Sequence, residues 1–588
     1  MVTVGETESK VIGSVSQDRL MADTEALARW VRLSGSEDER QAFEYVADVL
    51  RGLGLEPVLH LAPGYISLPK SADLQVNGNP IPAITHAMAA GTPPDGLDLP
   101  LVYVGDGSPT ADATKDLTGT IVLLDGIAAP EAVRAAQEAG AAACVFATSD
   151  QYVHEMIVSG VWGSPDPSNR ERLPKIPVVS VGREERDRLR SLLAAGNPVR
   201  AHLTTTVSTS WREIPTLTVQ VDGPRDTDEF VLLSGHIDSW HYGAMDNGSA
   251  NAGMLETLRA VLPHRDTFRR GLRLAFWSGH SHGRYAGSTW YADAFWEDLH
   301  DNCAVHINVD SLGGRNATVL TEANAMAETY AVAAAVIRAV ADVEFVGTRF
   351  GRAGDQSLQG IGVPSLFMSL SEQPPDSERV NTLAVITGGG DAKSGGLGWW
   401  WHTTEDTADK IDPDLLLRDA RIYAAVTYRF LAAPVLPLDL RASSRDLWSH
   451  LRHWQEEAGD RFDLSPVLSR AEEVAGLAAR LQERIERLGD RVDDETAHRL
   501  NQAIVAAERP LVRLNYAQSG PYAHDPARGQ PPVPLLAPLD DLPATAPGSD
   551  ESHELHTLLV RRCNQVLHEL TEARRALLTG LAATDHSG

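Results

Sequence analysis

"EFVLLSGHIDSWHYGAMDNGSANAGMLETLRAVL" (residues 229–262) is the stretch that decides the fold of this chain. It begins with a short apolar run, passes through a polar loop and ends in a segment whose apolar residues recur at helical spacing. A strand that leads through a loop into a helix is typical of a βαβ unit. The polar loop therefore follows the end of a strand, where open α/β sheets place their ligands.

Strands and helices alternate through the whole region around this loop. This alternation predicts an α/β domain with a mostly parallel sheet that is flanked by helices on both faces. Polar residues repeatedly follow the predicted strands, which favours a binding site at one edge of the sheet. The further predicted elements are strands within 269–279, 302–314 and 362–370 and a helix within 327–343.

The regions on either side of this domain have different patterns of apolar and polar residues. Residues 76–212 contain short apolar runs closed by glycine and two helix–strand repeats, without an acid–base cluster, which indicates a structural or substrate-gating insert. Residues 443–588 read as helices that cover the enzyme domain or form a dimer face. Within them, 466–489 is a predicted helix that starts at a proline and stops at a glycine. Residues 521–547 contain eight prolines and are expected to form an extended connector.

Composition excludes several classes of protein. Lys and Arg total 52 against 80 Asp and Glu, a net charge of −28, which repels phosphate backbones and argues against nucleic acid as a partner. No apolar run reaches the length of a membrane span, so no membrane partner is expected. The first residues lack the basic start and apolar core of a secretion signal, which favours a cytoplasmic location. Cys144, Cys303 and Cys563 are widely spaced and are expected to be buried free thiols.

Five positions carry the candidate chemistry: His236, Asp238, Asp246, Asp310 and His402. Imidazole and carboxylate groups are the usual ligands of a hydrolytic zinc ion. Asp246 precedes a predicted helix and is able to bridge two metal ions with its two oxygens. Asp238 lies two residues after His236, where its carboxylate is able to accept the second N–H of a ligand histidine. Taken singly, such residues at strand ends are also common as loop caps.

Three stretches occur in the order of a known set of motifs: "GHIDSWHYGAMDNGSANAG" (235–253), "INVDS" (307–311) and "HTTEDTADKI" (402–411). They resemble the motifs of the co-catalytic zinc aminopeptidases and carboxypeptidases, in the branch that contains glutamate carboxypeptidase II and the transferrin receptor. In that branch a protease-associated domain interrupts the peptidase domain, and a helical dimerisation domain follows. The resemblance covers nearly the whole chain and implies a zinc exopeptidase-like fold.

The resemblance implies both a domain order and a ligand set. The expected domains are an N-terminal part of the peptidase-like domain (1–75), a protease-associated insert (76–212), the catalytic part (213–442) and a helical, dimerisation-like domain (443–588). By resemblance, one zinc ion is held by His236, Asp246 and Asp310. Asp246 and His402 are two of the three protein ligands of a second zinc ion, and Asp238 is the carboxylate that orients His236.

The stretch "FWSGHSHGRYAGSTWYAD" (276–293) departs from the family pattern. The family has two adjacent glutamates here, a general base and a metal ligand, followed by Gly-Leu-x-Gly-Ser. Counting back from 287–288 without a gap puts Ser281 and His282 at the two positions. Aligning on the first glycine of the pattern, with one inserted residue, puts His280 and Ser281 there. Under either alignment a histidine replaces one glutamate and a serine replaces the other.

Histidine is a good zinc ligand and, with an ordinary pKa of about 6.5, also a general base near neutral pH. His280 and His282 are therefore candidate catalytic residues, and His282 is also a candidate metal ligand. The lost negative charge predicts a weaker second site, so that one or two zinc ions bind. Arg284 adds positive charge that is able to hold a carboxylate or an oxyanion. The opposing hypothesis is that these side chains only form hydrogen bonds in a dead site.

Two further stretches lie near the predicted centre. The segment "GDQSLQGIGVPSLF" (354–367) resembles a family segment with Asp355 retained and Gln356 in place of the usual histidine. The three tryptophans 399–401 are expected to form a wall of the substrate pocket, with core packing as the alternative.

The sequence therefore predicts a zinc metallopeptidase of exopeptidase-like type with a variant catalytic centre. The expected substrate is a peptide or small amide, cleaved at an amide bond by metal-activated water, and the expected assembly is a homodimer. The alternative hypothesis is a catalytically inactive binding or scaffold protein that uses the same fold.

Overall fold

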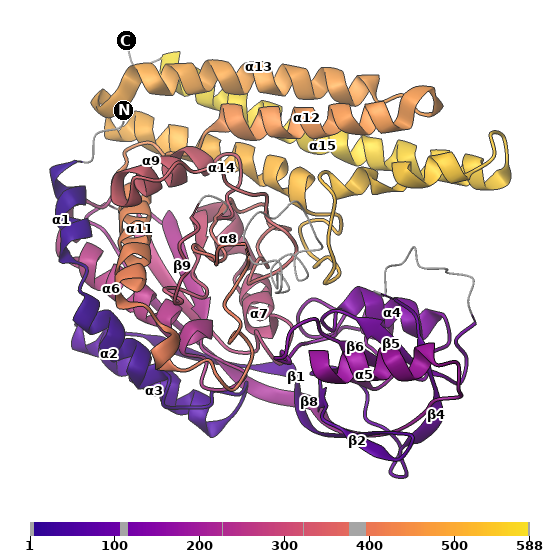
Figure 1. Cartoon of the computed structure of the whole chain (residues 1–588). Coiled ribbons are helices and arrows are strands. Elements are labelled where there is room, and N and C mark those ends of the chain that lie inside the picture. Colours follow the sequence, from indigo (N-terminus) through magenta and orange to yellow (C-terminus); the bar gives the residue numbers. More distant parts are fainter. Residues whose placement is uncertain (1–4, 106–115, 226, 321–322, 376–394, 586–588) are drawn as a thin grey trace.

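The computed structural model describes residues 5–585 except 106–115, 226, 321–322 and 376–394. Figure 1 shows three parts: an α/β domain, a smaller domain beside it, and a layer of long helices that lies across the α/β domain. The fold class expected from the sequence is confirmed.

The central sheet of the α/β domain has the strand order β12-β11-β9-β10-β8. The first four strands are parallel to one another, and β8 joins the edge in antiparallel orientation. All residues of β9 and β11 are buried, as expected for a sheet that is covered on both faces. The strands are β9 (Phe230–His236), β10 (Gly271–Trp277), β11 (Cys303–Asn308) and β12 (Ser365–Leu366).

Alternate residues of the central strands pack into separate cores. In β9, Val231 and Leu233 join the large core under α6, whereas Phe230 and Leu232 join the core under α7 and α8. This period of two explains why the strand is apolar throughout. Strand β12 is shorter than the sequence predicted, because Phe367 adopts a left-handed backbone (φ 62°) and turns the chain out of the sheet.

Helices cover both faces of this sheet. The helices of one face are α1 (Glu6–Ser14), α2 (Gln17–Leu27), α3 (Glu37–Gly52), α6 (Ala250–Val261), α9 (Tyr330–Ala341) and α11 (Pro413–Ala432), and those of the other are α7 (Ala286–Ala294) and α8 (Trp296–Asn302). Helix α11 begins where the carboxylate of Asp412 accepts the backbone N–H groups of Asp414 and Leu415, with Pro413 in the first turn.

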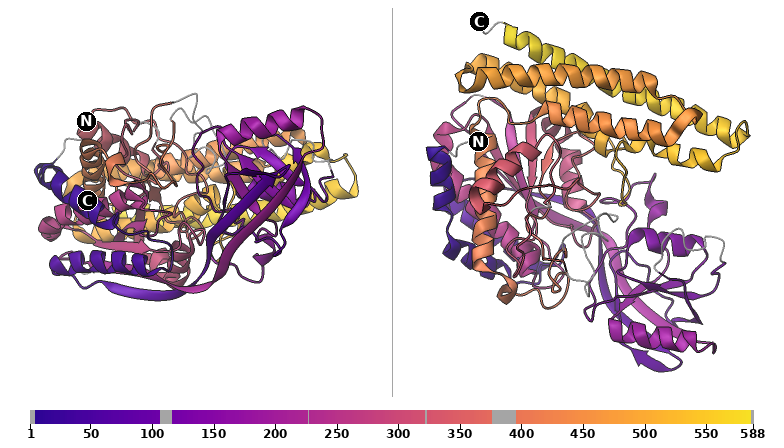
Figure 2. Two further views of the ribbon diagram at one scale, coloured as in Figure 1. Left: turned by 60° about the horizontal axis from the view of Figure 1, so that its bottom comes forward. Right: turned by 45° about the horizontal axis from the view of Figure 1, so that its top comes forward.

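Two long antiparallel strands, β1 (Val58–Val76) and β8 (Arg200–Val221), run through both the α/β domain and the inserted domain. Strand β8 pairs with β10 at one end and with β4 at the other, so that a single sheet links the two domains. Figure 2 shows this ribbon running from one domain into the other. The domain boundary expected near residue 76 therefore falls at the end of β1, and the one expected near residue 212 falls inside β8.

The inserted domain has its own small sheet and its own core, centred on buried valines and leucines. Strands β4 to β7 are parallel, and β3 closes the edge in antiparallel orientation. Its elements are β2 (Asn79–Ile81), β3 (Ile84–Thr85), β4 (Leu97–Tyr103), β5 (Ile121–Asp125), α4 (Pro130–Glu138), β6 (Ala143–Ala147), β7 (Val178–Val181) and α5 (Arg183–Ala194).

Four long helices form the C-terminal layer: α12 (Leu440–Ala458), α13 (Ser465–Leu488), α14 (Asp494–Tyr516) and α15 (Asp550–Asp585). The expectation of an extended connector over 521–547 is wrong in part, because Pro534–Ala544 form a 3-10 helix. Its leucines at 536, 539 and 542 are buried. Their spacing of three matches the three residues per turn of a 3-10 helix and places them on one face against the bundle.

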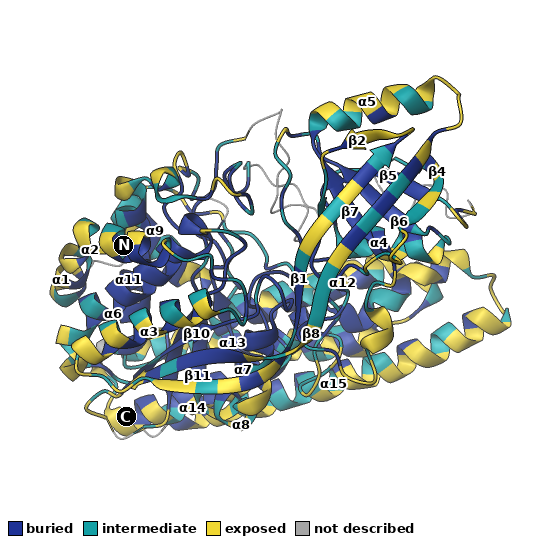
Figure 3. Ribbon diagram, turned by 90° about the horizontal axis from the view of Figure 1, so that it is seen from below, coloured by how far each residue is buried: buried dark blue, intermediate teal, exposed yellow. Residues whose placement is uncertain are grey.

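Burial separates the core from the surface along these elements. Figure 3 shows buried central strands, while helices such as α5 and α15 carry exposed stripes. Cys144 and Cys303 are buried free thiols as expected, and Cys563 is half-buried. No helix in the described part of the chain combines the length and the apolar character of a membrane span.

Arg509 of α14 ties the helical layer to the α/β domain. Its buried guanidinium donates to the carbonyl oxygens of His300 at 2.7 Å, Leu299 at 3.1 Å and Gly362 at 3.2 Å, and also to that of Cys303. Burial lowers the pKa of Arg509 to about 10, so the side chain stays charged at neutral pH. Because these carbonyls are buried between the two parts, removing the arginine takes away a charged donor from each of them.

We therefore expect Arg509→Met to lower the free energy of unfolding by about 3 kcal/mol or more. Calorimetric unfolding of the variant beside the wild type measures this change. The control is Arg499→Met on the same helix, whose side chain is 41% exposed and pairs with Glu495 on the surface, so a change within about 0.5 kcal/mol is expected. Equal unfolding temperatures for Arg509→Met and wild type would contradict this assignment.

Candidate metal centre

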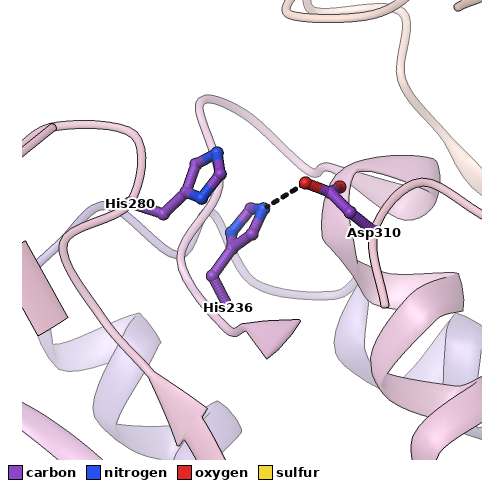
Figure 4. A group of neighbouring side chains, drawn as sticks. All are labelled: His236, His280 and Asp310. Atoms are coloured by element: carbon purple, nitrogen blue, oxygen red, sulfur yellow. Dashed lines mark ion pairs between the residues drawn. The ribbon is translucent and has the colours of Figure 1, made fainter. Parts of the chain in front are cut away.

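Five of the sequence-predicted residues meet at the carboxyl edge of the parallel strands. His236 ends β9 and Asp310 follows β11, while His280 lies in the loop after β10. Asp246 lies in the turn that precedes α6, and His402 comes from the loop before α11. Figure 4 shows His236 between His280 and Asp310. The parallel sheet brings together residues that are up to 166 positions apart, His236 and His402.

The carboxylate of Asp246 lies between two imidazoles. Its Oδ1 is 3.2 Å from Nε2 of His236, and its Oδ2 is 3.0 Å from Nε2 of His402. Asp310 approaches the same histidine, with Oδ2 3.7 Å from Nε2 of His236. Two oxygens that point at different histidines are the arrangement that a bridging carboxylate requires.

Backbone carbonyls fix the orientation of both imidazoles. Nδ1 of His236 donates to the carbonyl oxygen of Asp238 at 2.8 Å, and Nδ1 of His402 donates to that of Glu155 at 2.6 Å. With Nδ1 as the donor to a backbone carbonyl, Nε2 is the nitrogen of each ring that faces the carboxylates and is able to act as a metal ligand. Glu155 belongs to the inserted domain, so this domain helps to build the centre.

The carboxylate of Asp238 lies beside His236, and the orienting role expected for it stays a prediction. Its Oδ1 lies 3.6 Å from Nδ1 of His236, beyond hydrogen-bond distance, because the backbone carbonyl of the same residue takes that proton. The carboxylate instead accepts the backbone N–H groups of Ser281 at 2.9 Å and His280 at 3.2 Å, and the hydroxyl of Ser34 at 2.7 Å. Asp238 therefore holds the variant loop in place.

His280 is the histidine of the variant loop that joins the cluster. Its ring stacks on that of His236 with centroids 3.7 Å apart, and its Nδ1 lies 3.0 Å from Oδ2 of Asp355. A ring nitrogen of His236, a ring nitrogen of His280 and a carboxylate oxygen of Asp310 all lie within 4.8 Å of one another, close enough to share a metal ion. Burial would raise the pKa of Asp355, but the neighbouring His280 lowers it overall, so the carboxylate is charged and accepts the Nδ1 proton.

His282 lies elsewhere. Its Nδ1 contacts the hydroxyl of Ser34 at 3.1 Å, and its ring packs on Trp240 with centroids 4.4 Å apart. The side chain is 1% exposed, and burial lowers the pKa of His282 to about 4, which keeps it neutral. A cavity at the cluster is lined by Asp246, Asp310 and His402 and also by His280 and Ser281, but not by His282. This favours the alignment with one inserted residue.

The tryptophan run contributes one side chain to this cavity. Trp401 lines it, whereas the ring nitrogen of Trp400 lies 3.3 Å from the sulfur of Met245 and Trp399 stacks on Tyr152 with centroids 4.1 Å apart. The expectation of a pocket wall therefore holds for Trp401, and the other two rings pack against neighbouring side chains.

The electrostatics of the cluster favour a cation. Burial opposes a charged imidazole, but surrounding carboxylates raise the pKa of His236 well above its ordinary value. These carboxylates thus stabilise positive charge at Nε2. Nε2 of His236 and Oδ1 of Asp246 are also both buried without a hydrogen-bond partner. A buried imidazole nitrogen and a buried carboxylate oxygen that lack hydrogen-bond partners fit a zinc ion, which both groups commonly bind.

Three buried residues that the sequence analysis did not single out position the ligands. The carboxylate of Asp406 accepts the backbone N–H groups of Met245 at 2.9 Å and Asp246 at 3.0 Å. The side chain of Asn247 donates to the carbonyl of Val309 at 3.1 Å, which links the turn before α6 to β11. Asp406 and Asn247 lie inside the motif stretches 402–411 and 235–253, so their position in the sequence could have marked them.

Arg32 is the third positioning residue, and it comes from the N-terminal helical region. Its guanidinium donates to the carbonyls of Ile237 and Tyr242, each at 2.7 Å, and of Gly243 at 2.9 Å. These bonds hold the loop between His236 and Asp246. Arg32 lies about two hundred positions away in the chain, and no local pattern marks it.

Comparison with known proteins identifies both domains. Residues 217–427 match Peptidase family M28, and residues 97–189 match the PA domain. The resemblance expected from the sequence motifs is therefore confirmed, and the α/β domain has the M28 peptidase-like fold, a metallopeptidase fold. The M28 match ends within α11, so the C-terminal helical layer lies outside it.

Curated relatives include peptidases of two kinds. The chain is 24% identical over 308 residues to the probable glutamate carboxypeptidase VP8 of Zea mays (50% of this chain, 42% of the relative). It is 27% identical over 317 residues to the probable lipoprotein aminopeptidase LpqL of Mycobacterium tuberculosis strain ATCC 25618 / H37Rv (51% and 60%). It thus spans about half the length of the curated relatives it matches.

Solved structures show the same fold. An aminopeptidase from Aneurinibacillus sp. strain AM-1 superposes with a TM-score of 0.54 at 20% identity, covering 72% of this chain and 95% of that one. BSAP, a zinc aminopeptidase from Bacillus subtilis, also gives a TM-score of 0.54 at 20% identity, covering 73% and 96%.

The hydrogen bonds of Asp406 generate a prediction about metal affinity. We expect Asp406→Ala to weaken zinc binding by about 10–100-fold, because the backbone that carries Asp246 loses both of its acceptors. Competition with a chromophoric chelator measures the dissociation constant. The matched control is Asp409→Ala, where an exposed carboxylate pairs with Lys410, and its affinity should stay at the wild-type value. Unchanged zinc affinity in Asp406→Ala would refute the positioning role.

Proposed function

We propose that this chain is a zinc-dependent, peptidase-like hydrolase that cleaves an amide bond of a peptide or small amide. The observation that carries the proposal is the Asp246 carboxylate, which faces Nε2 of His236 with one oxygen and Nε2 of His402 with the other. The carboxypeptidase and aminopeptidase names of the relatives support an amide substrate.

The first metal position is held by His236, Asp246 and Asp310. Zinc bound there supplies a Lewis acid for the carbonyl oxygen and lowers the pKa of a water molecule. Asp246 and His402 face the second position. Ser281 stands at the glutamate position that ligates this second metal in the family, and it offers no negative charge. We therefore expect the second position to bind zinc more weakly, with one tightly held ion per chain.

His280 takes the place of the missing general base. Asp355 accepts the proton on Nδ1 of His280, which leaves Nε2 unprotonated at the cavity. In this proposal Nε2 removes a proton from the attacking water and later delivers it to the leaving amine. The stacked ring of His236 and the backbone bond to Asp238 hold the imidazole in place. Asp355 acts through His280 and is a positioning residue.

A second proposal competes with hydrolysis, namely an inactive binding or scaffold protein on the same fold. The observation that favours it is the replacement of both glutamates in the stretch 276–293. The retained ligand set argues against it, because a scaffold has no use for buried carboxylates that face an imidazole nitrogen without a hydrogen-bond partner. Assembly as a homodimer and a cytoplasmic location stay predictions under either proposal.

Metal content separates the two proposals. On protein purified without chelator, hydrolase function predicts about one zinc ion or more per chain in the wild type and its loss in His236→Ala. The control is His300→Ala, whose half-buried imidazole pairs with Asp301 outside the cluster and whose zinc content should match the wild type. Elemental mass spectrometry gives both numbers. A wild-type chain that holds no zinc even after zinc is added back would favour the scaffold.

The role of His280 is tested by hydrolysis of a peptide library. We expect His280→Ala to lower kcat by about 10²–10⁴-fold with zinc content unchanged, since it removes the base but none of the first-position ligands. Asp355→Asn should lower kcat less and shift the pH profile of kcat, because it alters only the hydrogen bond to Nδ1. Loss of zinc from His280→Ala would instead assign His280 as a ligand. Undiminished kcat in that variant would remove it from the mechanism.

A further inference from the structure

Arg284 differs from the other deeply buried arginines that the structure describes. Arg32, Arg270, Arg352 and Arg509 each donate to backbone carbonyl oxygens. Arg284 is 6% exposed, and its Nε is buried without a hydrogen-bond partner. Its guanidinium contacts the ring of the adjacent tyrosine, with 5.3 Å from Cζ to the ring centroid. Within the described residues, no ion pair of Arg284 with a carboxylate is found.

The backbone around Arg284 is held in a strained turn beside the metal centre. Arg284 and Tyr285 have φ values of 51° and 72°, a left-handed conformation that is uncommon for residues other than glycine. The N–H of Gly163 donates to the carbonyl of Arg284 at 2.6 Å, and the hydroxyl of Tyr285 accepts the N–H of Gly354 at 3.1 Å. The inserted domain and the loop before Asp355 thus fix the turn that places Arg284 at the cavity.

The cavity itself joins Arg284 to the residues of the candidate metal centre. Arg284 lines it together with His280, Ser281 and Asp310. The cavity measures about 60 Å³, which fits a small group. The rest of its wall is mainly apolar and includes Met156, Ile157, Trp240, Met368, Leu397 and Trp401.

A buried guanidinium without an anionic partner is unfavourable, because it loses hydration without gaining a counter-charge. The chain has 80 acidic residues that could have supplied one, yet the described carboxylates near the cavity pair with histidines or with backbone N–H groups. An incoming carboxylate would provide the missing charge and accept two parallel N–H bonds from a guanidinium.

We propose that Arg284 binds a carboxylate of the substrate, so that the substrate is a small amide or short peptide with a free carboxylate near the scissile bond. The proposal deepens the hydrolase function above and rests on it for the nature of the bond that is cleaved. The carboxylate belongs either to the C-terminus of the leaving amino acid or to an acidic side chain. The apolar wall then takes a small aliphatic group beside it.

Binding measured without turnover tests this inference on the zinc-loaded, full-length chain. The probes are N-acetyl-L-alanine, with a free carboxylate, and its neutral analogue N-acetyl-L-alaninamide. Isothermal titration should show that Arg284→Met weakens binding of the carboxylate probe by about tenfold or more and leaves that of the neutral probe unchanged. Arg284→Lys should give an intermediate loss, because it keeps the charge but not the fork geometry.

Two controls separate a direct contact from a structural effect. Arg188→Met, at an exposed position of α5, should bind both probes as the wild type does. A third probe, N-acetyl-L-glutamate α-amide, carries only a side-chain carboxylate. Tighter binding of this probe than of N-acetyl-L-alanine would assign the acidic side chain as the source, and the reverse order would assign the C-terminus.

Equal affinity of wild type and Arg284→Met for both carboxylate probes overturns the inference. An equal loss for the charged and the neutral probe also overturns it, since that pattern reports a disturbed cavity. Because no hydrolysis is required, a chain that binds the carboxylate through Arg284 but cleaves no amide would contradict the hydrolase proposal alone.

Discussion

The carboxylate of Asp246, fixed between the imidazoles of His236 and His402, is the constraint on which the centre depends. An ionised carboxylate is stable in a buried place only when cations or donors surround it. Several parts of the fold hold Asp246 and its two histidine neighbours in place. Asp406 holds its backbone, Arg32 holds the loop before it, and carbonyls of two different domains aim the two imidazoles.

This arrangement explains why the inserted domain and the α/β domain behave as one unit at the site. Strands β1 and β8 pass through both sheets, and the carbonyl of Glu155 in the insert orients His402. The insert thus contributes to the ligand geometry as well as to the walls of the cavity. A change in the packing of the insert would reach the centre through this hydrogen bond and through the one that the N–H of Glu155 donates to the carbonyl of His402 at 2.9 Å.

Much of this account was predictable from sequence because it depends on local patterns. Apolar runs that end in polar loops marked β9 and β11, and spaced motifs placed His236, Asp246, Asp310 and His402 at one edge. The choice between His280 and His282 was not predictable, because one inserted residue decides which ring faces the cavity. The hydrogen bond from Nδ1 of His236 to the backbone carbonyl of Asp238 was also not predictable, since every residue has a backbone carbonyl and the sequence does not show which one accepts.

The variant loop keeps the glycines and aromatic residues around the two glutamate positions of the family but replaces both glutamates, so the function proposed here depends on whether His236, Asp246 and Asp310 hold a metal ion. The most direct measurement is an anomalous difference map at the zinc absorption edge from crystals of the zinc-loaded chain. A strong peak is expected within bonding distance of Nε2 of His236 and of carboxylate oxygens of Asp246 and Asp310. A map without a peak at these three residues, at full zinc loading, would contradict it.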